Sequence, residues 1–97
     1  MPSARLEQYL RHFFGGVNPN GTRFHAINNA HVVHESGYEV TFGRNSVTYR
    51  DGSGVTRIEA ELTDVGLLVY SSKCAEQVVV ERVKSALTHL GVRQEHQ

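Results

Sequence analysis

The residues best suited to proton transfer or metal binding are three histidines in one short stretch, His25, His31 and His34. Imidazole titrates near neutral pH and is a common metal ligand. The segment 30–34 is predicted to be a strand, on which His31 and His34 would point to opposite faces. No carboxylate and cysteine pattern completes a four-ligand set beside them. We therefore predict surface or hydrogen-bonded structural histidines, without a metal site or a cofactor.

Cys74 is the best candidate nucleophile. It follows Lys73 and stands where a helix is expected to begin, and both a cation and a helix N-terminus stabilise a thiolate. A catalytic cysteine also needs an oriented base, and the sequence does not show that any histidine reaches Cys74. A structural cysteine is the simpler interpretation.

A single cysteine has no intrachain disulfide partner, and the residues after Met1 form no signal peptide, so a cytoplasmic protein is expected.

Glu59 and Glu61 form a third candidate, because two residues of one strand face lie about 7 Å apart, a spacing that a glycosidase pair could use. Arg57 belongs to the same alternating row. A row of charges on a solvated strand explains these residues without catalysis. The segment 51–54, Asp-Gly-Ser-Gly, lacks the lysine and hydroxyl residue of a phosphate-binding loop and is interpreted as a hairpin turn.

These candidates are positioned by alternating apolar and polar residues from Tyr38 to Tyr70, a pattern typical of an antiparallel β-meander. The last strand of this stretch is apolar on both faces, and exposed apolar edges promote aggregation. Something must therefore cover it: the N-terminal helix, the first strand, or a second copy of the chain. The predicted strands are 30–34, 38–42, 47–50, 55–62 and 67–70.

Two helices are expected to flank the meander. Apolar residues at helical spacing predict a helix over 3–14, capped by Ser3 and ended by a glycine pair. The second helix is expected to be capped by Ser71 or Ser72 and to end at Gly91. Residues 93–97 are predicted to be a frayed polar tail.

The sequence thus predicts one α+β domain over residues 1–97, with a mostly antiparallel meander of about five strands and both helices packed on one face. A chain of 97 residues has no apolar area for a second core. Ten Lys and Arg balance ten Asp and Glu, which disfavours general binding of nucleic acids. No segment reaches the roughly 20 apolar residues of a membrane span.

A small, neutral domain with a charged sheet face is better suited to protein recognition than to a reaction. The first hypothesis is a protein-binding module, such as a bacterial immunity or inhibitor protein or a self-associating accessory subunit. A homodimer could form over Leu67, Leu68, Val69, Tyr70 and the second helix. The alternative is a small hydrolase or nuclease that uses His31 or His34 with an arginine. The predicted partner-binding residues follow the polar strand face and one loop: Glu39, Thr41, Arg44, Arg50, Arg57, Glu59 and Glu61.

Overall fold

The fold is α+β, as the sequence predicts, with a sheet of seven strands in chain order in place of the expected five or so. A computed structural model describes residues 4–97. All neighbouring strands are antiparallel except β6 and β7, which are parallel. The elements are α1 (Ala4–Phe14), β1 (Phe24–Asn28), β2 (His31–His34), β3 (Tyr38–Phe42), β4 (Ser46–Asp51), β5 (Gly54–Thr63), β6 (Gly66–Val69), a 3₁₀ turn η1 (Ser71–Lys73), α2 (Gln77–His89) and β7 (Gln94–His96).

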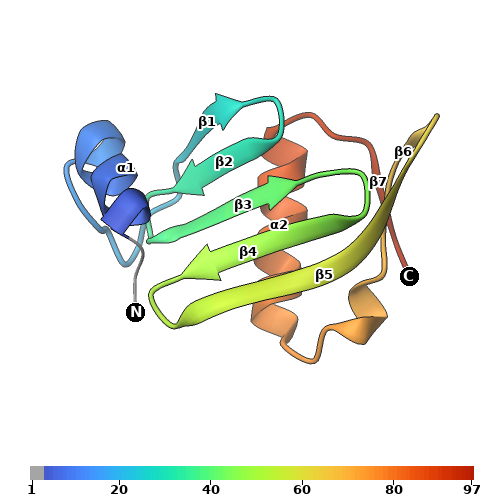
Figure 1. Ribbon diagram of the computed structural model, residues 1–97. Helices are drawn as coiled ribbons and strands as arrows, with labels where there is room; N and C mark the ends of the chain where they lie inside the picture. Colours follow the sequence, from blue (N-terminus) through green and yellow to red (C-terminus); the bar gives the residue numbers. More distant parts are fainter. Residues whose placement is uncertain (1–3) are drawn as a thin grey trace.

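The sheet curls into a half-barrel, with α2 lying across the back of it in Figure 1. The long strand β5 joins the two parts of the sheet. Its residues 54–59 pair with β4, and its residues 60–63 pair with β6. Because strands twist and coil, a strand that changes partners along its length bends the sheet around the helix behind it.

The main core lies between the inner face of the sheet and α2. The alternation in β3, β4 and β5 sends Val40, Val47 and Ile58 inward, where they are buried with Val83 and Leu87 of α2. Fully burying an aliphatic side chain of this size stabilises a fold by about 1.5–3 kcal/mol. The period-two pattern of the sequence therefore identifies the buried face of the meander correctly.

Helix α1 packs on the opposite face of the sheet from α2. Leu6 and Leu10 form a small core with Val33, whereas the neighbouring residue Val32 belongs to the core under α2. Successive residues of a strand point to opposite faces. The expectation that both helices share one face is therefore wrong, because β2 is buried on both sides. The predicted cap Ser3 lies outside residues 4–97.

The segment 93–97, predicted to be frayed, forms the strand β7 and covers the edge of β6. The Leu67 amide donates to the Arg93 carbonyl at 2.8 Å, and the Gln97 amide donates to the Val69 carbonyl at 2.9 Å. The apolar strand 67–70 thus has a neighbour within the chain. A second copy of the chain is therefore not needed to cover this strand, and the homodimer over it stays a prediction.

Helix α2 begins later than the sequence predicts. Residues 71–73 form the 3₁₀ turn η1, and Glu76 occupies the N-cap position of α2 without a side-chain cap. The serine hydroxyls at 71 and 72 are therefore not the helix caps that were expected. Within residues 4–97, neither helix has the length and apolar character needed to span a membrane.

Candidate functional site

The outer face of the sheet, opposite α2, is covered by a helix only at the β1–β2 end. There α1 packs on Val33, and among the described residues no helix extends over the outer side of β4, β5 and β6. We call this uncovered region the open face. The strand registers place ten side chains on it: Ser46, Thr48, Arg50, Val55, Arg57, Glu59, Glu61, Thr63, Leu68 and Glu95.

Most of the predicted partner-binding residues do lie on or beside the open face. Arg57, Glu59 and Glu61 are exposed on β5, and Arg50 is half-buried on β4. Arg44 is exposed in the β3–β4 loop and lines a surface hollow together with Glu61. Half-buried Thr41 sits on the same face in β3. Their role in binding stays a prediction.

Glu39 is the exception, because it is buried with only 6% of its surface exposed. Its Oε2 lies 2.9 Å from Nε2 of His31, and its Oε1 lies 3.4 Å from Nη1 of Arg50. The ring of Tyr9, from α1, contacts the His31 ring edge-on at 5.5 Å. The expectation of a solvated Glu39 is therefore wrong, since alternation identifies the face of a residue but not the position of α1 over it.

Charge is distributed unevenly along the open face. Arg57 lies toward the β4–β5 hairpin, on the side of Arg50, while Glu61 and Glu95 flank Leu68 at the other end. Between them, Glu59 pairs with the Lys73 ammonium, and this hydrogen bond raises the pKa of Lys73. Along β5 the open face therefore has Arg57 at one end, a neutralised Glu59 at the centre, and an acidic end at Glu61 and Glu95, beside which Arg44 also lies; Arg50 is itself paired with Glu39.

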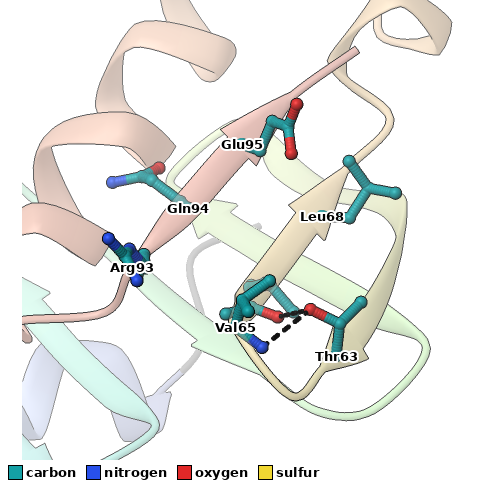
Figure 2. A pocket seen from close by; sticks show the side chains of 8 residues that line it. Thr63, Val65, Leu68, Arg93, Gln94 and Glu95 are labelled. Carbon is teal, nitrogen blue, oxygen red and sulfur yellow. Dashed lines mark hydrogen bonds between the residues drawn. The ribbon is translucent and has the colours of Figure 1, made fainter.

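A cavity of about 480 Å³ adjoins the acidic end (Figure 2). Val65 and Leu68 give it an apolar wall, and Arg93 and Glu95 of the β7 segment lie on its other side. Gly66 has a φ of +145°, and a Cβ there would come within 2.4 Å of the Arg93 carbonyl oxygen. Only glycine lets the two strands approach this closely. The lining contains no nucleophile–base pair.

His31, Glu39 and Arg50 form the arrangement closest to a catalytic one. A carboxylate that orients an imidazole beside a guanidinium could support proton transfer and stabilise negative charge. However, the side chains of His31 and Glu39 are each only 8% exposed. Four surface cavities of the described region are lined by other residues. None of these four cavities reaches the His31 imidazole.

The other two histidines of the sequence cluster make contacts of their own. His34 points to the inner face, where its ring stacks on Tyr38 at 4.6 Å and its Nδ1 lies 2.7 Å from the Ser36 hydroxyl. Burial lowers the pKa of His34. His25 stacks on Phe13 at 3.7 Å. Within residues 4–97, no group of three His, Cys, Asp or Glu side chains could hold a metal ion.

Cys74 does not occupy a helix N-terminus. It follows the 3₁₀ turn, three residues before α2 begins at Gln77, and its half-buried thiol donates to the Glu76 carbonyl at 3.7 Å. The neighbouring Lys73 is engaged with Glu59. The helix-terminus argument for an activated thiolate is therefore wrong, because the helix starts too late.

One partly buried polar cluster had no clear signal in the sequence. The Tyr49 hydroxyl donates to Asp51 Oδ2 at 2.7 Å and accepts a hydrogen bond from Arg82 Nη1 at 2.6 Å. The Arg82 guanidinium also lies over the Tyr38 ring, 4.9 Å from its centroid. Tyr49 and Asp51 are two residues apart on one strand and so share a face, but the approach of Arg82 from α2 depends on the tertiary fold. The cluster fastens α2 to the sheet.

No family model, no curated protein and no solved structure matches this chain. The exposed, charged open face and the buried His31 are the features of the molecule that bear on its function.

Proposed function

We propose that this protein is a small cytoplasmic protein-binding module whose partner docks on the open face. The observation that carries the proposal is the exposed side of β5, a ten-residue strand that no helix covers within the described structure. This strand is paired along its whole length, with β4 over residues 54–59 and with β6 over residues 60–63. It is therefore a rigid platform, and docking on it would cost little ordering entropy. An immunity or inhibitor protein, or an accessory subunit, would use such a platform.

The side chains of the open face suit protein recognition. Val55 is 57% exposed, and the half-buried Leu68 lies between two carboxylates. Exposed apolar groups among charges of both signs allow a partner to gain contact area while charge complementarity selects the partner and its orientation. The fitting surface would carry acidic groups opposite Arg50 and Arg57 and basic groups opposite Glu61 and Glu95.

The proposal is tested by reversing the charges at both ends of the open face. Arg57→Glu combined with Glu61→Lys should release a partner that the wild-type chain retains from a lysate of its native cells. Glu81→Lys, an exposed reversal on α2, is the matched control and should retain the same partner. Equal retention by wild type and by the double variant, with both chains folded by circular dichroism, would refute docking on this face.

A hydrolase or nuclease is the second candidate, and the contact between His31, Glu39 and Arg50 is the observation that favours it. The burial of His31 argues against this function, because general acid–base catalysis requires contact with the substrate. Activity on RNA, esters or phosphoesters that is lost in His31→Ala and kept in His25→Ala would establish it. Absence of any such activity in the wild-type protein would reject it.

A further inference from the structure

We infer that the occupant of the open face is a second copy of this chain, packed face to face about a two-fold axis. This inference rests on the proposed function, since it names the partner for the same surface. Two-fold dimers are the most common protein oligomers, and their interfaces must be self-complementary. The open face meets that requirement in the order of its charges along β5.

The charge pattern along β5 is complementary to its own reversal. Arg57 and Glu61 are both exposed on the outer side of β5, and a separation of four residues corresponds to about 13 Å along a strand. Consider a two-fold axis that lies in the plane of the interface, passes directly over Glu59 and runs perpendicular to β5. This axis places residue 57 of one copy opposite residue 61 of the other. Arg57 of each copy then faces Glu61 of the other, and this contact is made twice.

The residue on the axis would normally oppose such a dimer, because Glu59 would face its own symmetry mate. Here each Glu59 carries its own counter-ion, Lys73, whose ammonium also lies 5.4 Å from the centre of the Tyr70 ring. Two carboxylates and two ammonium groups would meet at the axis with no net charge. The zero formal net charge of the chain also removes long-range repulsion between copies.

The same operation brings an apolar side chain to a cavity. Val55 lies four residues before Glu59 and is 57% exposed, and the position four residues after Glu59 is Thr63, at the rim of the cavity beside Gly66. Val55 of one copy would therefore reach the cavity walled by Leu68 and Val65 of the other (Figure 2). Because the sheet curls away from β5 on both sides, the contact stays narrow. Interfaces of that kind bind weakly and reversibly.

The test is a charge exchange between two variants, followed by sedimentation velocity at low ionic strength. Arg57→Glu and Glu61→Arg each place like charges at both symmetry-related contacts, so each variant alone should dimerise about 30-fold more weakly than wild type. When they are mixed in equal amounts, the glutamate introduced at 57 faces the arginine introduced at 61, and the second contact is the native pair. The mixture should regain wild-type affinity as a heterodimer.

The controls separate this inference from the proposed function. Glu81→Arg, outside the interface, should dimerise like wild type, and added salt should weaken every dimer. A wild-type chain that remains monomeric up to about 1 mM at low salt, or a mixture that remains monomeric, overturns the second copy as occupant. Retention of a different protein that depends on Arg57 would in that case still support docking on the open face.

Discussion

The hydroxyl of Tyr49 should stabilise the fold much more than the hydroxyl of Tyr38. The two residues are almost equally buried, since Tyr49 is 2% exposed and Tyr38 is 4% exposed. In Tyr49→Phe, Asp51 loses a donor at 2.7 Å and Arg82 loses an acceptor at 2.6 Å. Hydrogen bonds to charged groups contribute about 1.5–3 kcal/mol each. Arg82 and Asp51 remain 3.8 Å apart and can partly compensate. We expect a net loss of about 2 kcal/mol.

Tyr38→Phe is the matched control. Among residues 4–97 the Tyr38 hydroxyl makes no hydrogen bond, and the contact of its ring with the Arg82 guanidinium at 4.9 Å is kept by phenylalanine. The free energy of unfolding should change by less than about 0.5 kcal/mol. Urea unfolding at pH 7 measures both variants, and for Tyr49→Phe the melting temperature should fall by about 10 °C. Equal losses in the two variants would refute the assigned role of the cluster.

Tyr38 and Tyr49 also predict how the stability of the fold changes at alkaline pH. Burial raises the pKa of Tyr38 and of Tyr49 to about 12, and for Tyr49 the hydrogen bond to Asp51 adds to the effect of burial. The folded protein therefore favours the neutral phenols. The resulting stability is complete below the ordinary tyrosine pKa of about 10 and is lost as the pH rises toward 12. Tyr49→Phe removes one of these groups, so its further loss of stability between pH 10 and 12 should be smaller than that of wild type.

Three further predictions concern other parts of the fold. A Cβ at Gly21 would lie 2.1 Å from Cγ of the buried Glu35, so Gly21→Ala should lower the free energy of unfolding by about 1–3 kcal/mol. Gly43→Ala is the control, because no atom lies within 4 Å of its new Cβ, and its free energy of unfolding should not fall. Equal urea midpoints for the two variants would contradict this. Burial lowers the pKa of His34 and of His96, so the unfolded chain takes up protons that the folded chain excludes. Stability should therefore fall as the pH drops below about 6.5, less steeply in His34→Gln, and urea midpoints that do not change between pH 7.5 and 5 would contradict this. Truncation after Val92 removes β7 and exposes the edge of β6, so light scattering should detect aggregation of the truncated chain and not of the full chain.

The sequence identifies the meander well because the strands between Tyr38 and Leu62 alternate regularly and only turn residues separate them. It does not identify β1, since the register shifts between Ala26 and Asn28 and this irregularity destroys the period-two pattern. It also misses β7, whose residues Gln94, Glu95 and His96 are polar. That strand is held by backbone hydrogen bonds to β6, and such bonds leave no mark on the order of side chains.

The candidate surface was predictable to a similar degree. Alternation places Arg57, Glu59 and Glu61 on the exposed side of β5, where the structure also has them. The burial of Glu39 was not predictable, because it depends on where α1 lies. The bipolar arrangement of the open face depends in addition on the strand register, which sets Leu68 beside Glu61 and Glu95 beside Leu68.

Carboxyl labelling with a water-soluble carbodiimide, read out residue by residue by mass spectrometry, tests the docking surface most directly. The labelling is compared between the dilute protein and the protein in its native assembly. Glu61 and Glu95 should lose reactivity in the assembly, while Glu7 on α1 and Glu81 on α2, which are also exposed, should keep it. Protection of the helix carboxylates with unchanged labelling of Glu61 and Glu95 would contradict docking on the open face.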